Sequence, residues 1–141
     1  MRREQKYPET KSFKFYNHNP KERITGDCMT RAVSLATGLD YGLTLLGIAA
    51  WEVKTCRNGG YEPLLESIGW KKMKQPRKAN GKKYTGAEFC RWLDAQGYKG
   101  GVVAHIGGHH MVAIMPTESG YKVHDIWNST DGSIGNWWVK S

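Results

Sequence analysis

Hydrophobic residues recur with a helical period through the first two thirds of the chain. Four segments show this pattern: 26–38, 40–55, 61–70 and 85–97. In the first segment, Asp27 occupies an N-cap position and Gly38 ends the apolar stripe. At the start of the last segment, Thr85 and Glu88 have the spacing of a capping box. We therefore expect four helices, of which the second, 40–55, is expected to be largely buried.

After residue 100 the pattern changes to short apolar runs separated by turn residues. Four such runs predict strands: 100–106, 110–115, 121–127 and 136–140. A further short strand is indicated at 13–16, inside a segment 1–24 that is otherwise irregular. Helices followed by strands predict an α+β domain with an antiparallel sheet. A length of 141 residues suits one domain over 1–141.

The composition is that of a folded protein, with 39% hydrophobic and 24% charged residues. No stretch approaches the roughly 18 apolar residues of a membrane helix, and the polar N-terminus lacks the apolar core of a secretory signal. Cys28, Cys56 and Cys90 are scattered and odd in number, which favours free thiols in a reducing compartment. We therefore expect a cytoplasmic protein with no membrane partner. Because no CxxC pair or HExxH motif occurs, neither a metal site nor a cofactor is predicted.

The formal net charge of +8 is concentrated in a basic loop predicted at 71–84. Its cations lie within 71–83, without an acidic residue among them: Lys71, Lys72, Lys74, Arg77, Lys78, Lys82 and Lys83. Such a run attracts nucleic acid or an acidic protein. The alternative is a solvated loop that maintains solubility, because a known binding motif or aromatic stacking would be needed to indicate a nucleic-acid site.

Cys28 is the candidate nucleophile. It follows Gly26 and Asp27 at the expected start of the first helix. The free amides and the dipole of a helix N-terminus favour the thiolate, which is the reactive form of cysteine. Gly26 would let a substrate approach the backbone closely. A buried structural cysteine is the alternative interpretation of Cys28.

A thiol nucleophile needs a base and a group that orients the base. If residues 117–120 form a four-residue hairpin loop, Val112 faces Asp125 and His110 faces Trp127. His110 and Asp125 then share the mostly apolar face, so we assign the base to His110 and the orienting role to Asp125. A five-residue loop would bring Asn128 to the face of His110, and a bulge at Gly107–Gly108 would exchange His110 for His109.

The stretches "GDCMTRAVSLATG", "HHMVAI" and "HDIWNS" resemble the papain-like cysteine peptidase superfamily, in particular small bacterial and phage members and the bacteriocin-processing peptidase domains. The resemblance covers about 26–38 and 100–129. It implies a papain-like α+β fold in which the nucleophile helix packs on the C-terminal sheet. It also implies a Cys28–His110–Asp125 triad that hydrolyses an amide or isopeptide bond of a peptide or protein through a thioester. Acyl transfer and deamidation are also known on related folds.

The resemblance further implies a substrate cleft and an oxyanion hole. Trp127, Trp137 and Trp138 near the C-terminus are expected to serve in core and sheet packing. The resemblance implies a second role for Trp127, which lies near the orienting residue and would form a wall of the cleft beside Gly26 and Asp27. Where the family has a glutamine that helps to form the oxyanion hole, six residues before the nucleophile, this chain has Glu22. A carboxylate would repel an oxyanion. The remaining candidates for this role are Asn17, Asn19, Arg23 and the backbone amide of Cys28.

A second function of a different class fits the same residues. The chain would then be a non-catalytic binding module on a papain fold, using the basic loop 71–83 to hold nucleic acid or an acidic protein partner. An antagonist of host defence encoded by a phage would fit either function. The binding module predicts strong salt dependence of binding and indifference to replacement of Cys28.

Overall fold

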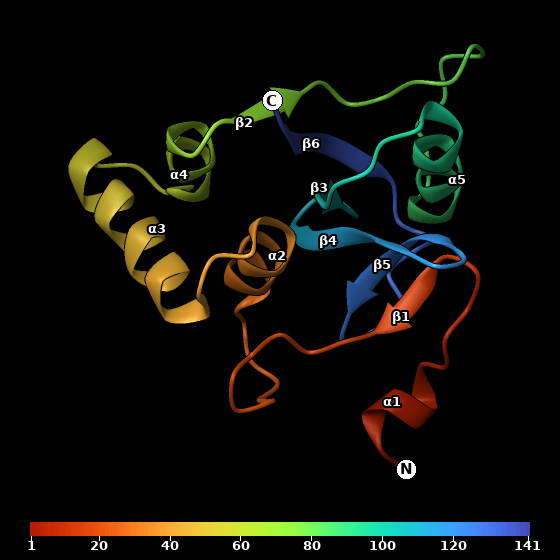
Figure 1. Ribbon diagram of the computed structural model, residues 1–141, viewed down its shortest axis with the longest axis horizontal. Helices are drawn as coiled ribbons and strands as arrows, with labels where there is room; N and C mark the ends of the chain where they lie inside the picture. The colour runs from red at the N-terminus through yellow and green to blue at the C-terminus, as the bar shows by residue number, and fades with distance from the viewer.

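A six-stranded mixed sheet forms the centre of the fold, and helices cover both of its faces (Figure 1). The computed structural model describes residues 1–141. Its helices are α1 (Arg3–Lys6), α2 (Cys28–Thr37), α3 (Tyr41–Thr55), α4 (Tyr61–Ser67) and α5 (Gly86–Gln96). Its strands are β1 (Phe13–Phe15), β2 (Trp70–Met73), β3 (Val102–Ile106), β4 (His110–Thr117), β5 (Gly120–Asp125) and β6 (Ile134–Lys140). The strand order is β1-β5-β4-β3-β6-β2.

The predicted α+β class is confirmed, as are the four predicted helices and the strands in the predicted segments. Helix α2 ends at Gly38, which adopts the left-handed conformation with a φ of 79°. Helix α5 begins with the predicted capping box. The Thr85 hydroxyl accepts from the Glu88 amide at 3.2 Å, and the Glu88 carboxylate accepts from the Thr85 amide at 3.0 Å. Local sequence signals therefore fix the C-terminal end of α2 and the N-terminal end of α5.

Three predictions about the sheet and the segments around it are wrong in part. The sheet is mixed rather than antiparallel, because β1 pairs with β5 in parallel. The supposedly irregular segment 1–24 also contains the short helix α1. The predicted basic loop 71–84 begins as a strand, because β2 pairs with β6 and places Lys71 opposite Val139. Lysines do not prevent this pairing, since both Lys71 and Lys72 project from the sheet into solvent.

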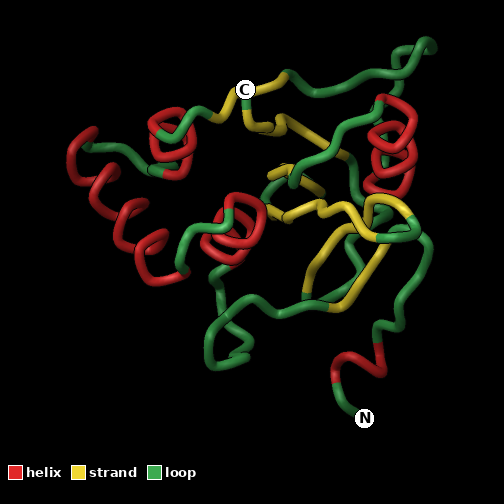
Figure 2. The backbone as a smooth tube through the Cα atoms, viewed as in Figure 1, coloured by secondary structure: helices red, strands yellow, loops and turns green.

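The prediction that 40–55 is largely buried is also wrong. Helix α3 packs only along the side that carries the buried residues Thr44 and Ile48. Leu43 and Leu46 are each 66% exposed, and Val53 is 79% exposed. In Figures 1 and 2, α3 lies at the edge of the molecule, with α2 between it and the sheet. Its outer side therefore contacts nothing in the chain.

Two hydrophobic cores lie on opposite faces of the sheet. One is formed under α5 and includes Phe89, Val112 and Trp137. The other is formed under α2 and α4 and includes Val33, Met111 and Trp138. Alternation along β4 and β6 sends neighbouring residues to opposite faces. The expectation that Trp137 and Trp138 serve in packing is confirmed, since they are 3% and 1% exposed.

No single helix is both long enough and apolar enough to cross a membrane. Helices α2 and α3 reach that length and apolarity only when taken together, and they meet at a bend of 117°.

Candidate active site

The hairpin of β4 and β5 sets the positions of the candidate base and its partner. Pro116 pairs with Tyr121, which confirms the predicted register. The loop itself is shorter than predicted, because Thr117 and Gly120 also pair and leave two residues between them. Since β4 begins at His110 and β5 ends at Asp125, the two side chains lie at the same end of the hairpin.

His110 and Asp125 form a direct hydrogen bond of 2.6 Å between Nε2 and a carboxylate oxygen. Asp125 is only 1% exposed and accepts three further hydrogen bonds. These come from the Ile126 amide at 2.8 Å, the Ser129 hydroxyl at 3.1 Å and the Arg31 guanidinium at 3.3 Å. A buried carboxylate with this many donors is held in one orientation, so it can fix the plane of the His110 ring.

Cys28 is the first residue of α2 and lies close enough to His110 for each side chain to shift the pKa of the other. The hydrogen bond with His110 lowers the pKa of the Cys28 thiol. Burial opposes this effect, and a hydrogen bond from the Met111 backbone adds to it. Because Nε2 of His110 is engaged by Asp125, Nδ1 is the ring nitrogen left for Cys28. The backbone amide of Cys28 has no acceptor within the chain.

The charged form of His110 is favoured at neutral pH. Burial alone would lower the pKa of the imidazole, but hydrogen bonds and charge from Asp125 and Cys28 outweigh it and raise the pKa to about 9. A raised histidine pKa beside a lowered cysteine pKa is the pattern of a thiolate–imidazolium pair. The Trp127 ring lies beside the His110 ring, with the two ring centroids 5.2 Å apart, and Trp127 is 37% exposed.

A buried arginine that was not among the predicted site residues pairs with two carboxylates at the site. The Arg31 guanidinium contacts Asp27 at 2.7 Å and Asp125 at 3.3 Å. Asp27 occupies the N-cap position of α2, as predicted, but its carboxylate caps no helix amide. It accepts instead from Arg31, from Asn19 at 3.0 Å and from Tyr41 at 2.8 Å. The spacing of Asp27 and Arg31, four residues apart on a helix, is the sequence signal that could have identified this pair.

Two candidate residues from the hairpin region lie outside this network. His109 is exposed in the turn before β4 and forms no hydrogen bond. Asn128, the alternative orienting residue, accepts from the Thr130 amide at 3.1 Å and the Thr130 hydroxyl at 2.6 Å. Asn128 therefore stabilises its own turn, and Asp125 is the residue bonded to His110.

The proposed oxyanion residues before Cys28 are engaged in their own loop. The Asn17 amide donates to the Arg23 carbonyl at 2.9 Å, and the Asn19 amide donates to Asp27. Glu22 is exposed and adopts a positive φ of 53°. Arg23 is exposed and makes no side-chain hydrogen bond. Of the predicted oxyanion donors, the Cys28 amide is therefore the one located at the thiol.

The same loop brings two residues to Cys28 that the sequence analysis gave no role. Tyr16 and His18 line a narrow cavity of about 10 Å³ together with Cys28 and His124. The Tyr16 hydroxyl and His18 Nδ1 are 3.1 Å apart. Burial lowers the pKa of His18, so its neutral form is favoured. Nothing in the local sequence pattern distinguishes His18 from a surface histidine. Gly26, a predicted cleft residue, is exposed beside this loop.

The basic segment 71–83 lies away from Cys28, along the β2 edge of the sheet and the connection to α5 (Figure 1). Two of its cations are paired with carboxylates, Lys72 with Glu62 and Lys78 with Glu88. The aromatic residues at its ends are not presented for stacking. Trp70 is 7% exposed, and the Tyr84 ring packs against the core.

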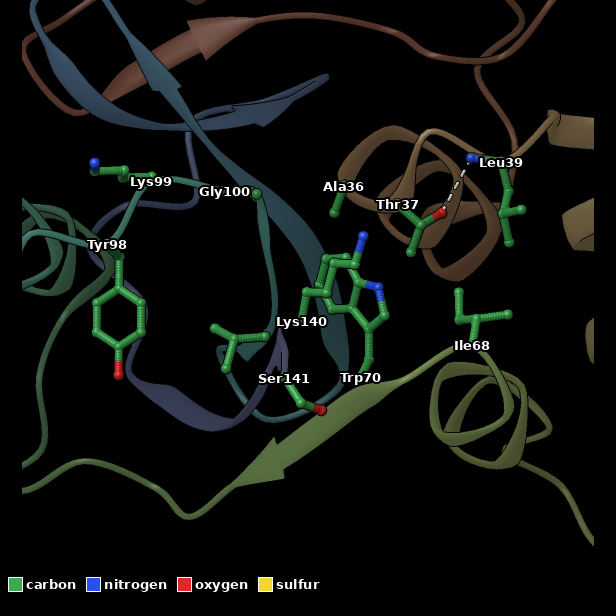
Figure 3. Close-up of a pocket in the computed structure, with 12 residues that line it drawn as sticks. Ala36, Thr37, Leu39, Ile68, Trp70, Tyr98, Lys99, Gly100, Lys140 and Ser141 are labelled. Atoms are coloured by element: carbon green, nitrogen blue, oxygen red, sulfur yellow. Dashed lines mark hydrogen bonds between the residues drawn. The ribbon is translucent and has the colours of Figure 1, made fainter.

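A separate cavity of about 540 Å³ lies at the other end of α2 (Figure 3). Its walls include Ala36 and Thr37 from the last turn of α2, together with Trp70 and Lys140. Because Cys28 opens the helix and this cavity lies at its end, the cavity is not part of the candidate site.

No cluster of three or more histidine, cysteine, aspartate or glutamate side chains is arranged to hold a metal ion. A scan against protein-family models found no family that matches the chain, and searches of curated proteins and of solved structures found no match. The geometry of Cys28, His110 and Asp125 is therefore the basis for the functional conclusion.

Proposed function

We propose that the chain is a papain-like thiol hydrolase that acts on an amide or isopeptide bond of a peptide or protein. The observation that carries the proposal is the connection of Cys28, His110 and Asp125 across three separate elements, α2, β4 and β5. The lowered pKa of Cys28 and the raised pKa of His110 support it, because a nucleophile and its base need pKa values matched to their task.

The arrangement supports the following reaction. The Cys28 thiolate attacks the substrate carbonyl carbon, and the Cys28 amide stabilises the oxyanion that forms. The His110 imidazolium then donates its proton to the leaving amine, the C–N bond breaks, and an acyl thioester remains. Neutral His110 next takes a proton from water, which attacks the thioester; the C–S bond breaks, the carboxylic acid leaves, and the Cys28 thiolate and the His110 imidazolium are restored. Asp125 keeps the His110 ring in place throughout.

Labelling with a peptidyl vinyl sulfone tests the nucleophile. Wild-type protein should label at Cys28, as located by mass spectrometry of the tryptic peptide. Cys28→Ala should abolish labelling, and His110→Ala should reduce it by about 10²–10⁴-fold, the usual contribution of a general base. Cys56→Ala is the matched control, because it removes an exposed cysteine outside the site. If Cys28→Ala labels as strongly as wild type, the proposal is wrong.

Hydrolysis itself is tested with a library of fluorogenic peptide amides. Turnover that requires Cys28 and is trapped by hydroxylamine as a hydroxamate would support the thioester route. Labelling of Cys28 without turnover of any amide, combined with salt-sensitive binding of nucleic acid that survives Cys28→Ala, would favour the binding module instead.

A further inference from the structure

The outer side of α3 is an apolar face without a partner in the chain. Four of the eight large hydrophobic residues that are exposed in the whole molecule lie on this helix: Leu43, Leu45, Leu46 and Val53. Exposed patches of this kind mark interaction sites, because isolated globular domains seldom leave them open. Figure 1 shows α3 as the outermost helix on its side of the molecule, so a partner can reach its full length.

The spacing of the exposed residues is that of a helix-pairing seam. Leu43, Leu46, Ala50 and Val53 are separated by three, four and three residues, which is the a/d spacing of a heptad repeat. All four are exposed, whereas Thr44 on the opposite side is buried. The small side chain of Ala50 in the middle of the seam allows a second helix to approach closely.

The charges at the ends of α3 indicate what that second helix is. Asp40 lies at its N-terminus, and Lys54 and Arg57 lie at its C-terminus. All three residues are exposed and none forms a salt bridge within the chain. The Asp40 carboxylate caps the Leu43 amide at 3.0 Å, and the Lys54 ammonium lies 4.7 Å from the Trp51 ring, but no opposite charge in the chain compensates any of the three. An antiparallel copy of the same helix would place its Lys54 and Arg57 beside Asp40, twice, by symmetry. A parallel copy would place like charges together.

We infer that the chain forms a two-fold symmetric dimer in which α3 pairs antiparallel with α3 of a second copy. In this pairing Leu43 meets Val53 of the second copy, and Leu46 meets Ala50. The helix dipoles are then antiparallel, and the acidic end of each helix lies against the basic end of the other. The inference does not depend on the proposed function, because Cys28 and His110 take no part in the seam.

The oligomeric state of the full chain tests the inference. Sedimentation equilibrium should give twice the chain mass of 15.9 kDa. Leu46→Lys should return the protein to 15.9 kDa while it stays folded by circular dichroism. Ala95→Lys adds the same charge at an exposed position of α5 and should leave the dimer intact. A monomeric wild type, or a dimer that survives Leu46→Lys, would overturn the inference.

Cysteine cross-linking tests the direction of pairing, in a background of Cys56→Ser. An equimolar mixture of Leu43→Cys and Val53→Cys chains should form a mixed disulfide on mild oxidation, whereas Leu43→Cys alone should not. Efficient cross-linking of Leu43→Cys alone would show a parallel pair and overturn the proposed register. Flotation of a monomeric wild type with phosphatidylglycerol vesicles would show that the face binds lipid, which also overturns the dimer.

Discussion

Replacing Arg31 by methionine should cause a large loss of stability without removing any of the three proposed catalytic residues. The substitution keeps most of the side-chain volume and removes the guanidinium that lies between two carboxylates. Arg31 is 7% exposed at its side chain, Asp27 is 9% exposed and Asp125 is 1% exposed. The substitution therefore leaves the buried Asp27 carboxylate without its counter-ion, and leaves Asp125 with the charged His110 as its one remaining cation.

Breaking a buried ion pair by removing one partner costs about 3–5 kcal/mol, because an uncompensated charge remains in the interior. We expect the free energy of unfolding of Arg31→Met to fall by about that amount near neutral pH, out of a typical total of about 5–15 kcal/mol. Lys72→Met is the matched control. Its pair with Glu62 is about two-fifths exposed, and such a pair contributes at most about 1 kcal/mol.

The pH dependence of this loss separates lost charge compensation from lost packing. In the wild type, burial tends to raise the pKa of Asp27, but hydrogen bonds from Asn19, Arg31 and Tyr41 lower it overall. A lowered carboxyl pKa contributes stability above the unfolded value of about 3.9 and loses it as the pH falls through the folded value. Without Arg31 the effect of burial gains weight, so the pKa of Asp27 should rise. We expect it to rise above the unfolded value, so that protonation of Asp27 at lower pH removes the uncompensated buried charge.

Urea denaturation of both proteins at about pH 8 and about pH 5 provides the measurement. Carboxyl groups with unperturbed pKa values near 4 are mostly ionised at both pH values, so the comparison reports a carboxyl group whose pKa is raised. The difference in unfolding free energy between wild type and Arg31→Met should be smaller at the lower pH. Adding Asp27→Asn to Arg31→Met should recover more than about 1 kcal/mol, since interacting neighbours are not additive. A loss below about 1 kcal/mol, or one that is equal at both pH values, would refute the reasoning.

Three further predictions concern single positions. Asp125→Asn should lower the pKa of His110 from about 9 towards or below its ordinary value of about 6.5, because burial then dominates; an NMR titration of the ring measures it, and an unchanged pKa would contradict the assigned contact. The stability that wild-type His110 contributes is complete below about pH 6.5 and is lost as the pH rises through about 9, so Asp125→Asn should flatten this part of the stability profile. Burial raises the pKa of the Cys90 thiol to about 12, so a thiol reagent should modify Cys28 and Cys56 in the folded protein and Cys90 only after unfolding; rapid modification of Cys90 in the folded state would contradict its burial. Gly60→Ala should cost at least about 1–3 kcal/mol in a thermal melt, because the added Cβ would lie 2.1 Å from the Ile48 carbonyl oxygen, whereas Gly100→Ala, with open space around it, should melt like the wild type.

The parts of the fold that the sequence predicts are those governed by local chemistry. Thr85 and Glu88 satisfy each other within one turn, and Gly38 ends its helix through its own backbone conformation, so both are readable from nearby residues. The register of the β4–β5 hairpin is similarly local, because alternation and a short turn decide it. This register brought His110 and Asp125 together correctly.

The errors occur where distant parts of the chain decide the outcome. Strand β1 pairs in parallel with β5 and places Phe13 opposite Val123. Nothing in the sequence of either segment indicates that the other is its pairing partner. Helix α3 is apolar on its outer side as well as its inner side, so its composition predicted burial that the chain does not supply. The role of Arg31 depends on Asp125, which lies 94 residues away in sequence. Periodicity within one element contains no information about such contacts.

The strand order leaves β1 and β2 as the two edges of the sheet. An edge strand exposes unpaired backbone groups that can recruit a strand from another molecule and begin aggregation. Here β1 is three residues long and carries the exposed Lys14, and β2 is four residues long and carries the exposed Lys71 and Lys72. Short length and lysine side chains are both established means of discouraging such growth. The lysines of β2 therefore have a protective role that requires no ligand. They discourage a strand of another molecule from pairing with this edge of the sheet, which is the first step of amyloid-like growth.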